Sequence, residues 1–176
     1  LIVSLARVKI NVTGMDVDKV PTDRKMLFVC NHQHDFDPVI IWSVFPNNDI
    51  GFIGKKEIYT TMPLVAKVMH KLYGLPIDRE NNREAAKTII QATKYIKEDK
   101  ASIAVFPEGY TSLECKLLPF RNGAFKIATK PQVPIVVCTL NGTREIPKRM
   151  IWRGCTVDFK VIDIIYPEDY EGMNTN

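Results

Sequence analysis

The chain has 176 residues, 45% of them hydrophobic, with 24 lysines and arginines against 20 aspartates and glutamates, a formal net charge of +4. This length and composition are typical of one globular domain with a sizeable core, and two domains are not expected. The basic excess is too small to indicate nucleic acid as a partner, and no basic run is interleaved with aromatic residues. An anionic substrate or a membrane surface would suit this charge.

The cysteines and the first residue of the chain indicate the cellular compartment and the extent of the protein. Cys30, Cys115, Cys138 and Cys155 show no CxxC spacing, and three of them sit in or beside apolar runs, so we interpret them as buried free thiols of a reducing compartment. No apolar stretch of these residues has the length of a membrane-spanning helix, and none shows the charged-then-apolar pattern of a signal segment. Because the chain begins at Leu1 rather than Met, we expect it to be part of a longer protein that has a preceding membrane-binding segment.

The first elements lead to a polar turn. Residues 1–6 resemble the tail of a helix or an anchor, and residues 8–12 alternate apolar and polar side chains as a half-buried strand does. Residues 26–30 predict a short buried strand, and a helix is expected from Pro38. The polar residues 31–37 therefore lie between a strand and a helix, where rigid folds commonly present catalytic side chains.

Within this turn, His32 and Asp37 are separated by four residues and can meet if the chain loops back. An imidazole oriented by a carboxylate is a general base. The alternative interpretation is structural, since a histidine near a turn is often only hydrogen-bonded, and Asp37-Pro38 is a common way to open a helix.

The next segment predicts a strand at residues 50–53, followed by Lys55 and Lys56. If this strand runs parallel to the previous one, the lysines lie on the same edge as the His32 turn; otherwise they open a solvated loop. Residues 63–73 begin with proline and carry a helical apolar stripe. His70 on this helix has no neighbours at metal-ligand spacing, so we interpret it as structural or exposed.

Two further segments carry candidate functional residues at the ends of predicted strands. Residues 74–79 form a brief extended segment that ends in Arg79, whose planar side chain can clamp a phosphate or pair with the adjacent Asp78. Asn82 is expected to cap a long amphipathic helix. Residues 101–106 predict a buried strand that runs into a turn, residues 107–112, with a carboxylate, a glycine and hydroxyls.

The remaining pattern completes the fold prediction. We expect a short helix through Ala128, a β-rich strand at residues 133–140, a basic loop at residues 141–153 and a last alternating strand at residues 155–165. Strands that alternate with helices predict an α/β fold, with a mixed central β-sheet flanked by helices on both faces in a single domain spanning residues 1–176.

Four blocks, taken in order, resemble the glycerolipid acyltransferase family that includes the bacterial PlsC-like 1-acyl-sn-glycerol-3-phosphate acyltransferases. They are Asn31-His32 with Asp37-Pro38, matching the NHxxxxD signature; Gly74 to Arg79; Phe106-Pro107-Glu108-Gly109, continued by residues 116–124; and Val133 to Val137. Each block is weak alone, but their order and spacing cover most of the chain.

The resemblance implies transfer of a fatty acyl group from coenzyme A or acyl carrier protein to the hydroxyl of a lysophospholipid, with no further cofactor and no metal. It assigns His32 as general base and Asp37 as its partner, in agreement with the chemistry of the two side chains. The resemblance also implies that Arg79 and the Glu108-Gly109 pair hold the acceptor. It further implies a location on the cytoplasmic side of a membrane, where the protein is peripheral or anchored by a preceding segment.

One departure concerns the acceptor. The family members that act on lysophosphatidic acid commonly have Thr-Arg-Ser after the Glu-Gly pair, whereas this chain has Tyr110, Thr111 and Ser112. With Thr111 in the substrate-binding block, a basic residue expected at the phosphate is missing. Arg79, Lys55, Lys56 or Arg121 would have to compensate, unless the acceptor is neutral or zwitterionic.

Three alternatives from other classes remain open at this stage. His32, His34 and Asp37 are possible ligands of a metal-dependent hydrolase, although the HxHxDH pattern is not met. Cys30 or Cys115 with His32 would make a cysteine hydrolase, although an apolar setting raises the pKa of a thiol. The third alternative is a lipid-binding module without catalysis.

Overall fold

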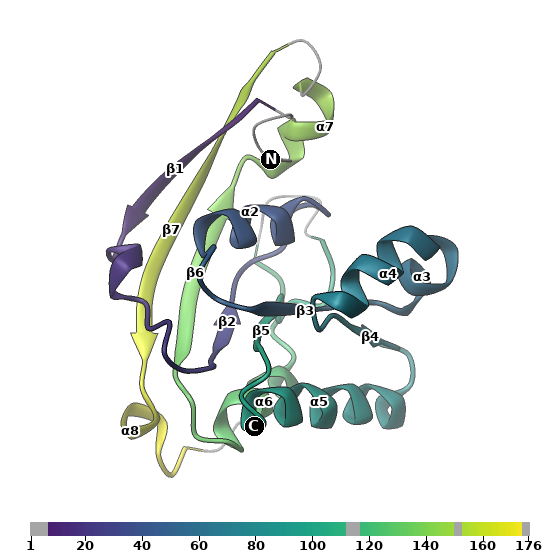
Figure 1. Cartoon of the computed structure of the whole chain (residues 1–176), viewed down its shortest axis with the longest axis vertical. Helices are drawn as coiled ribbons and strands as arrows, with labels where there is room; N and C mark the ends of the chain where they lie inside the picture. The colour runs from purple at the N-terminus through teal and green to yellow at the C-terminus, as the bar shows by residue number, and fades with distance from the viewer. Residues whose placement is uncertain (1–6, 112–116, 150–152, 174–176) are drawn as a thin grey trace.

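The computed structural model describes residues 7–111, 117–149 and 153–173, and its strands in this part of the chain form one seven-stranded sheet of order β1-β7-β6-β2-β5-β3-β4 (Figure 1). The strands are β1 Val8–Gly14, β2 Leu27–Val29, β3 Ile50–Lys55, β4 Leu75–Ile77, β5 Ser102–Val105, β6 Ile135–Asn141 and β7 Cys155–Ile165. The pair β6 and β7 is antiparallel and the other neighbours are parallel, so the predicted mixed sheet is confirmed.

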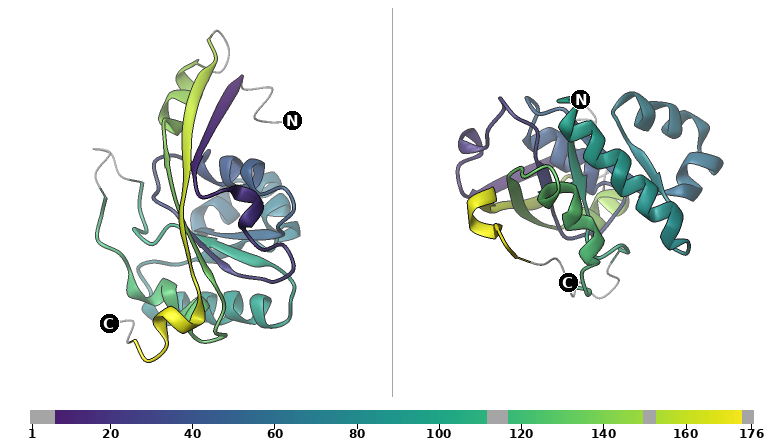
Figure 2. Two further views of the ribbon diagram at one scale, coloured as in Figure 1. Left: turned by 90° about the vertical axis from the view of Figure 1, so that its left-hand side faces the viewer. Right: turned by 90° about the horizontal axis from the view of Figure 1, so that it is seen from below.

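Helices cover both faces of the sheet, as predicted (Figures 1 and 2). The α-helices are α2 Asp37–Val44, α3 Lys56–Thr61, α4 Pro63–Lys71, α5 Asn82–Lys97, α6 Lys126–Thr129, α7 Ile146–Arg149 and α8 Pro167–Tyr170. Side chains of β2 alternate between two cores: Phe28 packs on the α2 side, while Leu27 and Val29 pack on the side of α5 and α6. Full burial of each such side chain contributes about 1.5–3 kcal/mol.

The β1–β7 end of the sheet has a different environment. Along β7, buried residues such as Val157 and Phe159 alternate with exposed ones such as Thr156 and Asp158, because one face meets the core and the other meets solvent. The predicted bounds of this strand, residues 155–165, are those observed. Figure 2 shows that β1 and β7 extend with α7 beyond the body of the molecule.

Several expectations are corrected. The alternative in which Lys55 and Lys56 open a solvated loop is not observed, because residues 56–61 form α3, and the expected loop at residues 141–153 contains α7 and a short 3-10 turn. The cap of α5 is Asn81 rather than Asn82, because Asn81 has extended backbone angles and its side chain accepts from the second and third N–H groups that follow it. The expectation for residues 1–6 lies outside the described residues.

Candidate active site

The site lies on the carboxyl edge of the parallel strands. Since β2, β5, β3 and β4 are neighbours that run in the same direction, the turns that follow them meet along one edge of the sheet. These turns carry His32, Lys55, Arg79 and Glu108, with Lys55 as the last residue of β3. The structure therefore confirms the prediction that the lysine end of β3 shares an edge with the His32 turn.

His32 and Asp37 contact each other at this edge. The distance from Nδ1 of His32 to Oδ2 of Asp37 is 2.7 Å, and the same oxygen accepts from the backbone N–H groups of Gln33 and His34 at 2.6 and 2.9 Å. A carboxylate only accepts hydrogen bonds, so Nδ1 donates and Nε2 of the neutral ring is left unprotonated. Among the described residues Nε2 has no hydrogen-bond partner, which leaves it available to take a proton.

Asp37 does not act as a helix cap. The cap of α2 is Phe36, which makes no side-chain capping bond, and the carboxylate of Asp37 points back to the turn that precedes it. Asp37 is 0% exposed, and within residues 7–111, 117–149 and 153–173 no group donates a hydrogen bond to its buried Oδ1. Because such an atom costs about 1–3 kcal/mol, the arrangement is better explained by its effect on His32 than by stability.

Buried polar contacts fix the backbone of the His32 turn. Both carboxylate oxygens of Glu108 accept backbone N–H groups, one from His32 at 2.9 Å and one from Leu118 at 2.8 Å. The side chain of Asn31 bonds the N–H and C=O of Leu140, which continues the β6 ladder onto the turn. Glu108 is buried and each of its carboxylate oxygens accepts one of these N–H groups, so it fixes the backbone of the turn; a contact from Glu108 to the acceptor stays a prediction.

Further contacts support the imidazole ring. It stacks on Phe106, with ring centroids 4.2 Å apart and planes 13° from parallel. Gln33 accepts from the N–H of Gly142 through its side chain and from Nε of Arg144 through its backbone carbonyl, which joins the turn to the segment after β6. Neither Asn31 nor Gln33 was predicted as a site residue, although both are polar residues that flank the histidine and Asn31 belongs to the NHxxxxD block.

A cavity of about 460 Å³ opens beside this edge on the α5 side of the sheet. Phe106 lines it and stacks on His32, so it links the cavity to the imidazole. The other lining residues form an apolar wall from β3 to β5 and α5, with a basic rim. The wall includes Ile53, Ile77, Ala85, Ala86, Ile89, Ile90 and Val105, and the rim includes Arg79, Arg121, Lys126 and Lys130.

Two guanidinium groups of this rim flank one aromatic ring. The Cζ atoms of Arg79 and Arg121 lie 5.2 and 5.5 Å from the ring centroid of Tyr110. Burial lowers the pKa of Arg79, and its buried Nη1 finds no hydrogen-bond acceptor in the part of the chain that the structure describes. Gly109 has φ +77°, and a Cβ there would lie 3.0 Å from Nε of Arg121, so the missing side chain leaves room for this arginine. Thr111 does not line the cavity.

The other candidates from the sequence, Lys55, Lys56 and His34, have side-chain environments of their own. Lys55 is exposed, and Lys56 forms an ion pair with Asp78 at 3.4 Å. Nδ1 of His34 accepts from the backbone N–H of Phe36. Of the described residues, no three histidines, cysteines or acids are grouped closely enough to hold a metal ion.

The thiols and His70 have structural environments. Burial raises the pKa of the Cys30 thiol well above its usual value, which disfavours the thiolate that a nucleophile needs. Cys138 and Cys155 are also buried free thiols, whereas Cys115 lies outside the described residues. His70 lies on α4 with its ring 5.1 Å from that of a tyrosine on α3.

Known proteins are similar to most of this chain. The family model described as Acyltransferase matches residues 9–141. The 1-acyl-sn-glycerol-3-phosphate acyltransferase of Haemophilus influenzae is 30% identical over 166 residues, which cover 92% of this chain and 68% of that protein. The protein of the same name from Escherichia coli K12 is 30% identical over 150 residues, 82% of this chain and 60% of that protein.

A solved structure has the same fold. The crystal structure of the 1-acyl-sn-glycerophosphate (LPA) acyltransferase PlsC from Thermotoga maritima matches with a TM-score of 0.73 and 25% identity, over 93% of this chain and 64% of that chain. The chain spans from about half to two thirds of the length of the relatives it matches, 48% in the case of the Limnanthes douglasii enzyme. On the extent of the family match and the identity to the Haemophilus influenzae protein, this chain belongs to the acyltransferase family.

Proposed function

We propose that this protein transfers a fatty acyl group from an acyl thioester, carried by coenzyme A or acyl carrier protein, to the hydroxyl of 1-acyl-sn-glycerol-3-phosphate. The observation that carries this proposal is the 2.7 Å contact between His32 and the buried Asp37, which leaves Nε2 free at the edge of the sheet. The names of the Haemophilus influenzae and Escherichia coli relatives support the choice of acceptor.

In the proposed reaction, Nε2 of His32 takes the proton of the acceptor hydroxyl as its oxygen attacks the thioester carbonyl. The new C–O bond gives a tetrahedral intermediate, and its collapse breaks the C–S bond and releases the thiolate, which takes the proton from the imidazolium. Asp37 stabilises the imidazolium while it exists. These reaction steps need no covalent acyl-enzyme and no cofactor other than the acyl donor.

The cavity supplies surfaces suited to both halves of the substrates. Its apolar wall fits an acyl chain, and its basic rim fits a phosphate. We assign the phosphate to Arg79 and Arg121, with Lys55 near the same edge, because no described residue provides an acceptor for Nη1 of Arg79. These arginines compensate for the threonine at position 111, and Gly109 is needed for the room it leaves. Thr111 itself remains a predicted contact to the acceptor.

The acceptor lipid also implies a membrane partner. Within the described residues, the helices are too short or too polar to cross a bilayer. We propose that the protein works at the membrane surface, on the cytoplasmic side where acyl thioesters are made, as a peripheral protein or through a preceding anchor.

A thiol-release assay tests the proposal. Acyl coenzyme A and acyl carrier protein are each offered with lysophosphatidic acid, lysophosphatidylcholine, lysophosphatidylethanolamine and glycerol 3-phosphate, and products are identified by mass spectrometry. We expect the fastest thiol release with lysophosphatidic acid and only background release by the folded His32→Ala variant. Equal release by this variant, or no acceptor-dependent release with any lysolipid, would overturn the proposal, and hydrolysis that a chelator abolishes and zinc restores would favour a metal-dependent hydrolase.

A further inference from the structure

Helices α3 and α4, with Met62 between them, form a helical hairpin at the β4 end of the sheet (Figure 1). The hairpin follows the last residue of β3 directly, so its base lies on the carboxyl edge beside the candidate active site. No residue of α3 is buried, and Ala66 is the buried residue of α4. The outer face of α4 is therefore open to solvent.

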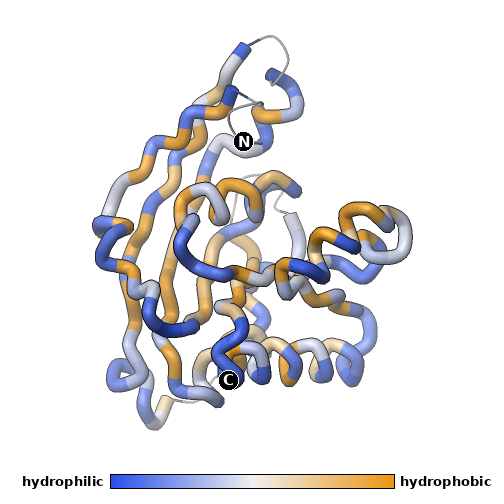
Figure 3. Tube along the Cα trace, in the orientation of Figure 1, coloured by the Kyte–Doolittle hydropathy of each residue, from blue (hydrophilic) through white to orange (hydrophobic). Residues whose placement is uncertain are grey.

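That face carries an apolar stripe, which consists of Leu64, Val65, Val68 and Leu72. All four side chains are exposed, Leu64 by 76% and Val68 by 48%. At 3.6 residues per turn their positions fall within about 100° of the helix circumference, so they form one continuous patch. Figure 3 shows hydrophobic segments on this projecting hairpin. A patch of this kind on one helix marks an interaction surface, whereas single exposed aliphatic residues do not.

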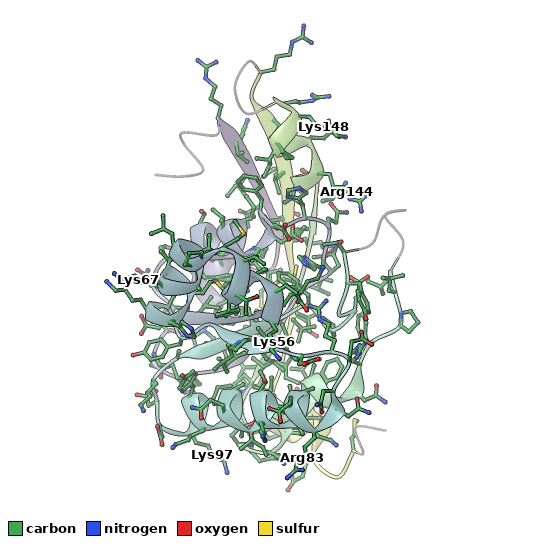
Figure 4. All side chains as sticks on the ribbon, turned by 90° about the vertical axis from the view of Figure 1, so that its right-hand side faces the viewer. Lys56, Lys67, Arg83, Lys97, Arg144 and Lys148 are labelled. Carbon is green, nitrogen blue, oxygen red and sulfur yellow. The ribbon has the colours of Figure 1, made fainter. Side chains whose placement is uncertain are left out.

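Lysines border the stripe. Lys67 and Lys71 are exposed and four residues apart, next to the stripe on α4, and Lys55 and Lys56 lie at the base of the hairpin. Figure 4 shows Lys56 and Lys67 on the side of the molecule where the hairpin lies. From residue 55 to residue 73 the only acidic side chain is Glu57, against four lysines. An apolar stripe bordered by lysines is typical of helices that lie in the interface of a membrane.

We propose that the α3–α4 hairpin docks on a bilayer that contains anionic lipid, with the apolar stripe at the boundary of head groups and acyl chains and the lysines among the head groups. A lipid surface fits better than a protein partner, because lysine is depleted in the cores of protein interfaces, whereas its long stem lets the ammonium reach anionic head groups. This inference rests on the proposed function in one respect: it brings the carboxyl edge to the surface where a lysophospholipid acceptor resides.

Cosedimentation with vesicles tests the inference without any substrate. The probes are vesicles of phosphatidylcholine alone and of phosphatidylcholine with one quarter phosphatidylglycerol. The test variant is Leu64→Ser/Val68→Ser, and the matched control is Ile162→Ser/Val12→Ser, which removes two exposed aliphatic side chains from β7 and β1. Each variant is first checked for native circular dichroism and melting temperature.

We expect the wild type and the control to bind the anionic vesicles within twofold of each other, and the hairpin variant to bind at least tenfold more weakly. Lys67→Gln/Lys71→Gln should weaken binding to anionic vesicles at least threefold and leave binding to neutral vesicles unchanged. The inference is overturned if the hairpin variant binds as the control does, if the wild type binds neither vesicle, or if the stripe instead supports a dimer that sedimentation detects and the hairpin variant loses.

The test separates this inference from the proposed function. Vesicle binding is measured without acyl transfer, so docking can be found in a protein that transfers no acyl group. Conversely, acyl transfer to a short-chain, water-soluble lysophosphatidic acid should be the same for the hairpin variant and the control. A hairpin variant that keeps this activity and also keeps vesicle binding contradicts only the docking inference.

Discussion

Asparagine at position 37 would remove the charge that faces His32 while it keeps an oxygen in place. In the structure Oδ2 of Asp37 accepts one N–H from the imidazole at 2.7 Å and two from the turn backbone, and the amide oxygen of asparagine is a neutral acceptor in the same place. The imidazolium would lose its counter-charge: two unit charges about 4 Å apart interact by about 4 kcal/mol at an effective dielectric constant of 20. Since about 1.4 kcal/mol changes a rate tenfold, kcat should fall about 1000-fold.

The assay is thiol release from acyl coenzyme A at saturating lysophosphatidic acid, with the unfolding temperature of the variant as a control. The new amide NH₂ would occupy the place of the buried Oδ1, for which the described residues offer no hydrogen-bond partner, at a cost of about 1–3 kcal/mol. A chain of this size should then melt roughly 2–12 °C lower, and the assay is run well below that temperature. A folded Asp37→Asn variant that keeps more than a tenth of the wild-type kcat would refute the assigned role of the carboxylate.

Three further outcomes follow from the contacts of the site. Glu108→Ala leaves the N–H groups of His32 and Leu118 without their acceptor, so urea unfolding should show a loss of about 2–4 kcal/mol, and a loss below about 0.5 kcal/mol would contradict the positioning role. Gly109 has φ +77°, and Gly109→Ala would add a Cβ 3.0 Å from Nε of Arg121. The free energy of unfolding should therefore fall by about 1–2 kcal/mol, and the KM for the acceptor should rise several-fold. An unchanged KM would argue against Arg121 as the phosphate contact. Burial raises the pKa of the Cys30 thiol, so its thiolate forms only at a pH above the usual range. After the folded protein is treated with iodoacetamide at pH 8, peptide mass mapping should find Cys30 unmodified. Extensive labelling of Cys30 would contradict its buried state.

The sequence predicts an element well where its side chains repeat with the period of that element. The bounds of β7 are predicted to the residue, because apolar and polar side chains alternate along a strand that has one buried face. Residues 56–61 have no such signal, since α3 is six residues long and buries none of them. The cap of α5 is a choice between two adjacent asparagines, and the backbone angles and side-chain hydrogen bonds of Asn81 distinguish them.

Within the candidate active site, the sequence predicts contacts between residues that are close together in the chain. His32 and Asp37 are five positions apart, so one turn can bring them together. Glu108 acts on the backbone of His32 from 76 positions away, and spacing carries no information on such a contact. The stacking of two arginines on Tyr110 likewise depends on how three separate segments meet at the edge of the sheet.

The proton on the imidazole of His32 is the central element of the mechanism, and ¹⁵N NMR of the labelled protein at neutral pH observes it directly. In the neutral form of the ring, the contact with Asp37 predicts a proton on Nδ1 and a bare Nε2, with a low-field Nδ1 proton that moves to higher field in Asp37→Asn. A neutral ring protonated on Nε2 would contradict the account, because that nitrogen could not then take the proton of the acceptor hydroxyl.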